Sequence, residues 1–89
     1  MRIEKSKLTV FTPLDDGTGV LLNKETLLYF SLNRSGVALW QELDRSGPVT
    51  IDDLVRATCD RFDVSEEDAQ KQIETFLNRL EQFQMIRAV

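Results

Sequence analysis

Hydrophobic and polar positions alternate in the first third of the chain in a way that predicts three short strands. Apolar side chains alternate over Lys7–Phe11, recur over Gly19–Asn23 and dominate Leu27–Leu32. The first connection, Asp15-Asp16-Gly17, carries the short polar residues and glycine typical of a turn, and Pro13 is expected to end the first strand. The second connection is the three-residue turn Lys24-Glu25-Thr26. Neighbouring short strands with tight turns predict an antiparallel meander.

From Asn33 onward the apolar period changes from two to about 3.6, which predicts helices. We expect helices over Arg34–Arg45, from Thr50 onward, and from Ser65 to about Gln82. Asn33, Thr50 and Ser65 have side-chain oxygens that can accept the free N–H groups of a first helical turn. The expected apolar stripes are Gly36, Leu39, Trp40 and Leu43; Ile51, Leu54, Val55, Thr58 and Phe62; and Ala69, Ile73, Phe76, Leu77, Leu80 and Phe83. The order βββααα predicts an α+β, winged-helix-like domain.

The third predicted strand raises a question of coverage, because it carries large apolar side chains on both faces. In a plain meander Leu27–Leu32 would also be an edge strand with unpaired backbone groups, which natural sheets cover or use. Three alternatives remain open from the pattern alone. The chain's own helices cover the strand, an extended peptide adds to it, or a second copy pairs with it to form a homodimer.

Charge argues against nucleic acid as the partner. The 89-residue chain has a formal net charge of −4 and a pI near 4.7. The helix expected over Ser65–Gln82, which would be the recognition helix of a helix-turn-helix, carries five acidic and two basic residues. DNA binding depends on neutralised phosphates, so this sign is wrong for it. An acidic winged-helix regulator remains the alternative from another functional class.

Composition also argues against catalysis and membrane insertion. The chain contains no histidine and a single cysteine, Cys59, so the usual activated nucleophiles and histidine metal sites have no support. No glycine-rich phosphate loop is present, and we expect no cofactor and no metal site. No apolar run approaches the roughly 20 residues of a membrane span, and the N-terminus is no signal peptide, so a cytoplasmic location is expected.

The sequence resembles the PqqD-like family, the precursor peptide recognition elements of ribosomally synthesised and modified peptides. The likeness runs from about Leu8 to Ile86. Its most specific part is Leu32-Asn33 followed by Ser35-Gly36 and Trp40, and hydrophobic spacing carries the rest. The resemblance implies that residues 1–89 form a single recognition domain without catalytic activity. Such a domain binds the leader segment of a precursor peptide and presents it to a radical SAM maturase or a lasso-type leader peptidase.

The resemblance also implies where the leader would bind. It would add as an antiparallel strand beside the third strand, in a groove walled by the third helix. On this sequence the peptide-binding residues would be Leu27, Leu28, Tyr29, Phe30 and Ser31 from the strand and Gln72, Ile73, Thr75, Phe76 and Arg79 from the helix. Arg79 is a candidate partner for an acidic leader side chain.

Two positions depart from the family pattern. Gln84 stands where members often have glycine before the apolar pair Met85-Ile86, a tail that we expect to pack against the body of the domain. Trp40 stands where members devoted to pyrroloquinoline quinone synthesis tend to have smaller aliphatic residues. We therefore expect a PqqD-like or lasso-type recognition protein rather than the quinone-pathway member itself.

Overall fold

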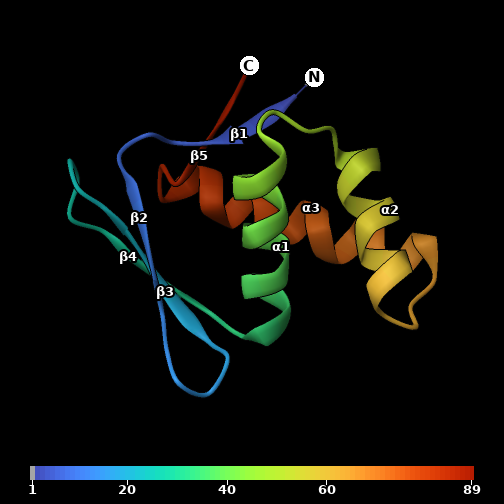
Figure 1. Ribbon diagram of the computed structural model, residues 1–89. Coiled ribbons are helices and arrows are strands. Elements are labelled where there is room, and N and C mark those ends of the chain that lie inside the picture. Colours follow the sequence, from blue (N-terminus) through green and yellow to red (C-terminus); the bar gives the residue numbers. More distant parts are fainter. Residues whose placement is uncertain (1) are drawn as a thin grey trace.

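The central sheet has three antiparallel strands in the order β2-β3-β4 (Figure 1). The computed structural model describes residues 2–89. Strand β2 spans Thr9–Pro13, β3 spans Gly19–Asn23 and β4 spans Tyr29–Leu32. The predicted meander is therefore confirmed, with β3 in the centre and β2 and β4 at the two edges.

Two predicted strand boundaries are wrong. The first strand begins at Thr9 rather than Lys7 and includes Pro13, which pairs with Gly19. A proline is tolerated there because β2 is an edge strand, where a missing N–H need not break a ladder. The third strand begins at Tyr29, because Leu27 has a φ of 61° and lies in the turn with Leu28.

The three predicted helices are present. Helix α1 spans Arg34–Ser46, α2 spans Ile51–Arg61 and α3 spans Glu66–Gln82. All three predicted N-cap side chains accept a first-turn backbone N–H: Asn33 from Gly36, Thr50 from Asp53, and Ser65 from Asp68. The three-stranded sheet followed by three helices is the predicted fold class.

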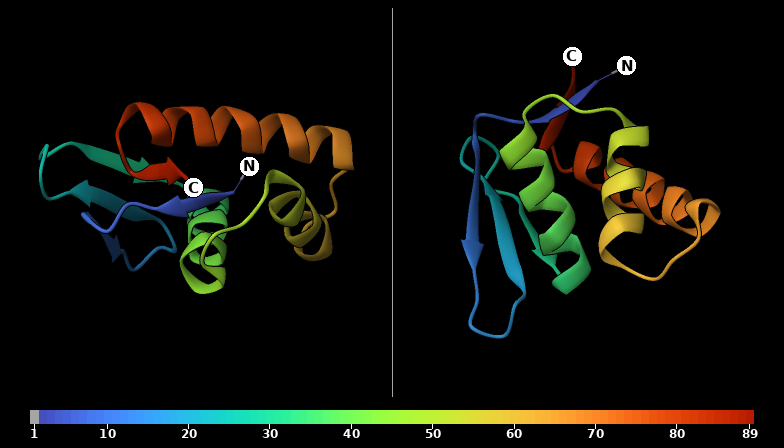
Figure 2. Two further views of the ribbon diagram at one scale, coloured as in Figure 1. Left: turned by 90° about the horizontal axis from the view of Figure 1, so that it is seen from above. Right: turned by 45° about the vertical axis from the view of Figure 1, so that its right-hand side comes forward.

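The core lies between the inner face of the sheet and the three helices. Helix α3 runs along one side of the domain, with α1 and α2 packed on its other side (Figure 2, left). Alternation along β3 and β4 directs Leu21, Phe30 and Leu32 to the helices and leaves Tyr29 and Ser31 outside. The largest fully buried side chains are Trp40, Leu21, Leu43, Leu54, Ile73, Leu80 and Met85. The Trp40 indole thus fills the centre of the domain.

A second, two-stranded sheet joins the two ends of the chain, which the pattern did not predict. Strand β1, Ile3–Lys5, pairs antiparallel with β5, Ile86–Ala88. Arg87 Nε donates to Glu4 Oε1 at 2.7 Å across this pair. Ile3 also exchanges two backbone hydrogen bonds with Val49 before α2. The apolar tail is buried as expected, and it continues as this strand.

Helix α3 ends in a left-handed turn at Gln84, whose φ is 59°. Met85 N–H donates to the Leu80 carbonyl at 2.9 Å and Gln84 N–H donates to the Glu81 carbonyl at 3.0 Å. These are the two bonds of a Schellman motif, and Leu80 and Met85 supply its buried apolar contact. Glycine would adopt this turn more easily than Gln84 does, because glycine has no Cβ to oppose a positive φ.

Candidate functional site

The open edge of β4 carries unpaired backbone groups. Asn23 N–H donates to the Leu28 carbonyl at 3.0 Å, and hydrogen-bonded pairs alternate with non-bonded pairs along an antiparallel ladder. Leu21–Phe30 is therefore a bonded pair, while Tyr29 and Ser31 lie in the intervening pairs. The N–H and C=O groups of Tyr29 and Ser31 thus point away from β3. Four backbone hydrogen-bonding groups face the open edge.

The turn before β4 is held by one buried side chain. Asn23 is 2% exposed, and its Oδ1 accepts the N–H groups of Glu25 at 2.9 Å and Thr26 at 3.0 Å. Its Nδ2 donates to the Gln84 carbonyl at 2.8 Å. This amide therefore joins the start of β4 to the end of α3. It also accounts for the tight turn that places Leu27 at a positive φ.

Aromatic packing fixes the distance between β4 and α3. The Phe30 ring lies 5.2 Å from Phe83 and 6.2 Å from Phe76, centroid to centroid, with both pairs edge-to-face. Such arrangements are favoured by the quadrupoles of the rings. Phe30 therefore packs against α3 and forms part of the floor between the helix and the open edge.

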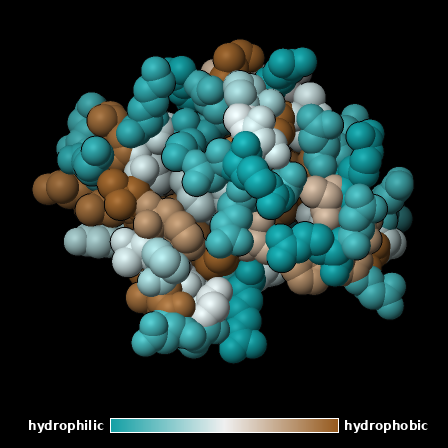
Figure 3. Space-filling view, in the orientation of Figure 1, coloured by the Kyte–Doolittle hydropathy of each residue, from teal (hydrophilic) through white to brown (hydrophobic). Residues whose placement is uncertain are grey.

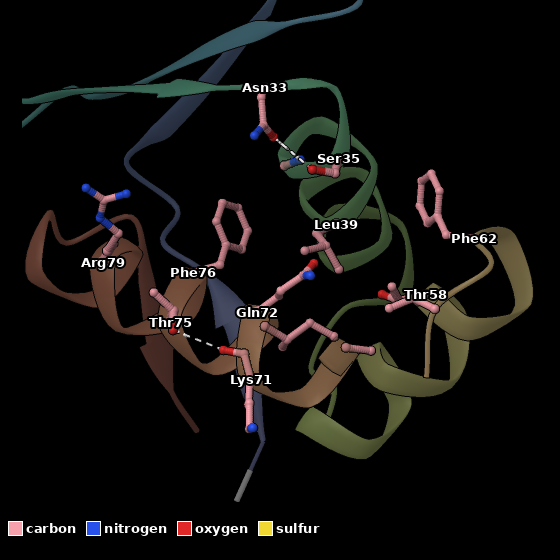
Figure 4. A pocket seen from close by; sticks show the side chains of 14 residues that line it. Asn33, Ser35, Leu39, Thr58, Phe62, Lys71, Gln72, Thr75, Phe76 and Arg79 are labelled. Atoms are coloured by element: carbon pink, nitrogen blue, oxygen red, sulfur yellow. Dashed lines mark hydrogen bonds between the residues drawn. The ribbon is translucent and has the colours of Figure 1, made fainter. Parts of the chain in front are cut away.

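Beside this edge lies a groove of about 590 Å³ between α1, the end of α2 and α3 (Figure 4). We call it the groove throughout. Its lining residues are Asn33, Ser35, Gly36 and Leu39; Thr58, Phe62 and Val64; and Ala69, Lys71, Gln72, Ile73, Thr75, Phe76 and Arg79. Gln72 and Phe76 point from α3 into the space facing α1, while Lys71 points away from it. The surface of the groove is mostly apolar, although seven of its fourteen lining residues have polar or charged side chains.

The charged residues that line the groove are both basic, although the chain as a whole is acidic. The Lys71 ammonium lies 3.5 Å from a carboxylate oxygen of Glu67. Arg79 forms no ion pair with any carboxylate of residues 2–89. In Figure 4 its guanidinium extends from α3 on the side of the β4 ribbon, at the end of the groove away from Phe62. Arg79 is thus an exposed cation between the groove and the open strand edge.

All five residues predicted on the third helix line the groove: Gln72, Ile73, Thr75, Phe76 and Arg79. Ile73 is only 1% exposed, so it forms the floor rather than a contact surface.

The five residues predicted on the strand do not line the groove. Tyr29, Phe30 and Ser31 belong to β4 beside it, and Leu27 and Leu28 lie in the preceding turn, where 67% and 42% of their surfaces are exposed. Exposed apolar side chains gather on this side of the molecule, at the left of Figure 3.

The sequence reasoning missed the contribution of α1 and α2 to the groove. Leu39, Thr58 and Phe62 were assigned to core stripes, but Leu39 and Thr58 are half-buried and Phe62 is 43% exposed. Asn33 was recognised as a cap alone. The width of the predicted apolar stripes on these helices was the signal that could have revealed this. A stripe wider than the area that packs against the core leaves some of its apolar side chains at the surface.

Within residues 2–89, no three histidine, cysteine, aspartate or glutamate side chains are grouped to hold a metal ion. Among the same residues, no helix is long and apolar enough to cross a bilayer.

The model of the family described as coenzyme PQQ synthesis protein D (PqqD) matches residues 18–86, which include the open edge and the whole groove. The chain belongs to the PqqD family. This match confirms the resemblance seen in the sequence. A search of curated proteins finds no match.

Two solved structures share the fold of this PqqD-family chain. One is TbiB1 in complex with the TbiA(beta) leader peptide, with 23% identity, a TM-score of 0.85, and coverage of 97% of this chain and 96% of that chain. The other is lasso peptide synthetase B1 complexed with the leader peptide, with 19% identity, a TM-score of 0.81, and coverage of 99% and 100%. At these identities the likeness establishes the fold.

Proposed function

We propose that this protein is a non-catalytic module that binds the leader segment of a ribosomally synthesised precursor peptide by strand addition to β4. The observation that carries the proposal is the open edge, where the backbone groups of Tyr29 and Ser31 are unpaired beside an apolar groove. Strand addition derives affinity from main-chain hydrogen bonds and specificity from pockets for alternate side chains. The open edge of β4 offers the main-chain groups, and the groove offers a pocket for side chains. Membership of the PqqD family and the two leader-bound structures of the same fold support this reading.

The peptide would run antiparallel to β4. Residues opposite Phe30 and Leu32 would direct their side chains inward toward α3, because cross-strand neighbours share a face. Residues preceding the paired segment would enter the groove, which lies beyond the Asn33 end of the strand. Gln72, Thr75, Phe76 and Arg79 would form the wall that contacts the peptide. The downstream end would leave near Leu27 and Leu28.

The enzyme that acts on the bound precursor is part of the same proposal. A radical SAM maturase or a lasso-type leader peptidase would receive the core segment where it leaves the domain, beside the start of β4. The lasso type is the better supported of the two, because one structure of this fold is lasso peptide synthetase B1 complexed with the leader peptide.

The test separates backbone recognition from side-chain recognition at one position. Synthetic N-terminal segments of the short peptides encoded beside the gene are titrated into labelled protein and followed by NMR. Ser31→Pro removes an edge N–H that β3 does not use, and Ser31→Ala keeps it. We expect unchanged affinity for Ser31→Ala and about a tenfold loss for Ser31→Pro, the value of one hydrogen bond at the upper end of its range.

Shift changes outside residues 27–39 and 68–83, or equal affinities for the two Ser31 variants with both folded by circular dichroism, would contradict strand addition. Tyr29→Pro provides a second edge variant if Ser31→Pro does not fold. The alternative regulatory function predicts salt-sensitive DNA binding, which fluorescence anisotropy with duplex DNA measures directly.

Self-association through paired β4 strands would use the same edge and therefore compete with the peptide. Sedimentation with and without bound peptide decides between the two uses. Strand addition predicts a one-to-one complex, and a dimer that persists unchanged with peptide bound would place the peptide elsewhere.

A further inference from the structure

Arg79 combines three properties that suit a ligand contact. It is exposed, it lies at the junction of the groove and the β4 edge, and it has no carboxylate partner within residues 2–89. The other cation of the groove, Lys71, is partnered by Glu67 and points away from the groove (Figure 4). Of the two cations that line the groove, Arg79 is therefore the one without a carboxylate partner among residues 2–89.

The direction of α3 relative to β4 orders the contacts that a bound peptide would meet. The end of α3 lies beside the start of β4, through the Asn23–Gln84 hydrogen bond and the Phe30–Phe83 contact. Gln72, one turn before Phe76, lies at the opposite end with Asn33. Helix α3 thus runs opposite to β4 and in the same direction as an added antiparallel peptide. Such a peptide would meet the apolar groove first and Arg79 afterwards.

The spacing along α3 gives the spacing along the peptide. Gln72 and Arg79 are seven residues apart, about 10 Å at the helical rise of about 1.5 Å per residue. An extended peptide covers that length in about three residues at about 3.4 Å each. Side chains on one face of a strand recur every two residues. A side chain that reaches Arg79 therefore follows the one in the groove by two or four positions.

From this geometry we infer that the peptide bound here carries a large apolar residue followed two or four positions later by aspartate or glutamate. The apolar side chain fills the groove between Leu39 and Gln72, and the carboxylate pairs with Arg79. The inference rests on the proposed function, because it requires an extended peptide along β4. It adds the direction, the spacing and the charge of the segment that is recognised.

The first experiment needs no knowledge of the natural peptide. A displayed library of random 12-residue peptides is selected against the wild-type protein, Ser31→Pro, Arg79→Gln and Lys71→Gln. We expect the wild type to enrich peptides with the apolar-to-acidic spacing, Lys71→Gln to enrich the same set, and Arg79→Gln to retain the apolar position while losing the acidic one. Lys71→Gln is the matched control, since it removes a groove cation that already has a partner.

The outcomes separate this inference from the proposed function. If the wild type and Ser31→Pro enrich the same peptides, or neither enriches any, strand addition itself fails. If the wild type enriches apolar peptides with no acidic preference, or if the preference survives in Arg79→Gln, the inference fails and strand addition stands.

A quantitative check uses one selected peptide and its Asp→Asn or Glu→Gln counterpart. Anisotropy titrations with the wild type and Arg79→Gln complete a double-mutant cycle. We expect the neutral peptide to bind the wild type about fivefold more weakly, the upper range of an exposed ion pair, and to bind Arg79→Gln as well as the acidic peptide does. The fivefold difference should shrink in 1 M salt. Equal losses with both proteins would overturn the pairing.

Discussion

Replacing Asn23 by alanine should destabilise the domain and loosen the binding edge together. Asn23 is nearly fully buried, and its side chain makes three hydrogen bonds, two within the turn before β4 and one to the Gln84 carbonyl after α3. The two turn N–H groups belong to exposed or half-buried residues, so water can partly replace their acceptor. The Gln84 carbonyl borders the buried Met85 and loses its donor.

The expected size of the effect follows from these three bonds. Each turn bond contributes about 0.5–1 kcal/mol, and a carbonyl left without a partner costs about 1–2 kcal/mol. Asn23→Ala should therefore lower the free energy of unfolding by about 2–4 kcal/mol. A small domain has about 5–15 kcal/mol in total, so the variant should remain folded at 25 °C.

Urea unfolding followed by circular dichroism measures this loss, with the same slope against denaturant expected for both proteins. Asn23→Asp retains the acceptor oxygen for Glu25 and Thr26 but places a buried carboxylate oxygen against the Gln84 carbonyl. Its loss of stability therefore reports the broken link between β4 and α3 together with the cost of burying that charge. A loss below about 1 kcal/mol for Asn23→Ala would refute the argument that this buried amide holds the turn. Peptide affinity should fall with Asn23→Ala even where the protein remains folded, because the start of β4, with Phe30, would be held less firmly against α3.

Two further predictions concern the ends of helices. Gln84→Gly should raise the free energy of unfolding by about 0.5–1 kcal/mol, because glycine adopts the left-handed turn without opposition from a Cβ. The urea midpoint measures this gain. As the control, Gln70→Gly inside α3 should lower the free energy of unfolding by about 1 kcal/mol. The Thr50 backbone N–H, and then its hydroxyl, lower the pKa of Asp53 below its ordinary value of 3.8. The ionised Asp53 therefore stabilises the fold above that value, and the contribution is lost as the pH falls through the lower folded-state pKa. Asp53→Asn should be less stable than the wild type at pH 7 and lose less stability on going to pH 3; parallel pH profiles in urea titrations would rule out this role of the capping box.

The local elements could be predicted because their causes lie within a few residues. A helix start needs a cap and an apolar stripe, and Asn33, Thr50 and Ser65 supply the caps where the structure has them. The end of α3 at Gln82 also agrees with the expectation. The charge argument against DNA required only the sequence. The residues of the α3 wall came from the resemblance to the family, carried onto this sequence.

Other features depend on contacts between distant parts of the chain. Strands β1 and β5 have three residues each, too short for a pattern to reveal, and they exist because Ile3 and Ile86 are buried together when the ends of the chain meet. The hydrogen bond from Asn23 to the Gln84 carbonyl, which ties the turn before β4 to the end of α3, likewise joins residues far apart in the sequence.

The sequence by itself determined the kind of domain, the order of its elements, its acidic charge and the helix that forms one wall of the site. Only the tertiary structure decided which backbone groups of β4 stay unpaired, since that depends on the register of β3 against β4. It also decided that side chains of α1 and α2 face those of α3 across one groove. The physical reason is that periodicity records which face of an element is apolar, whereas the fraction of that face left open depends on how the elements pack.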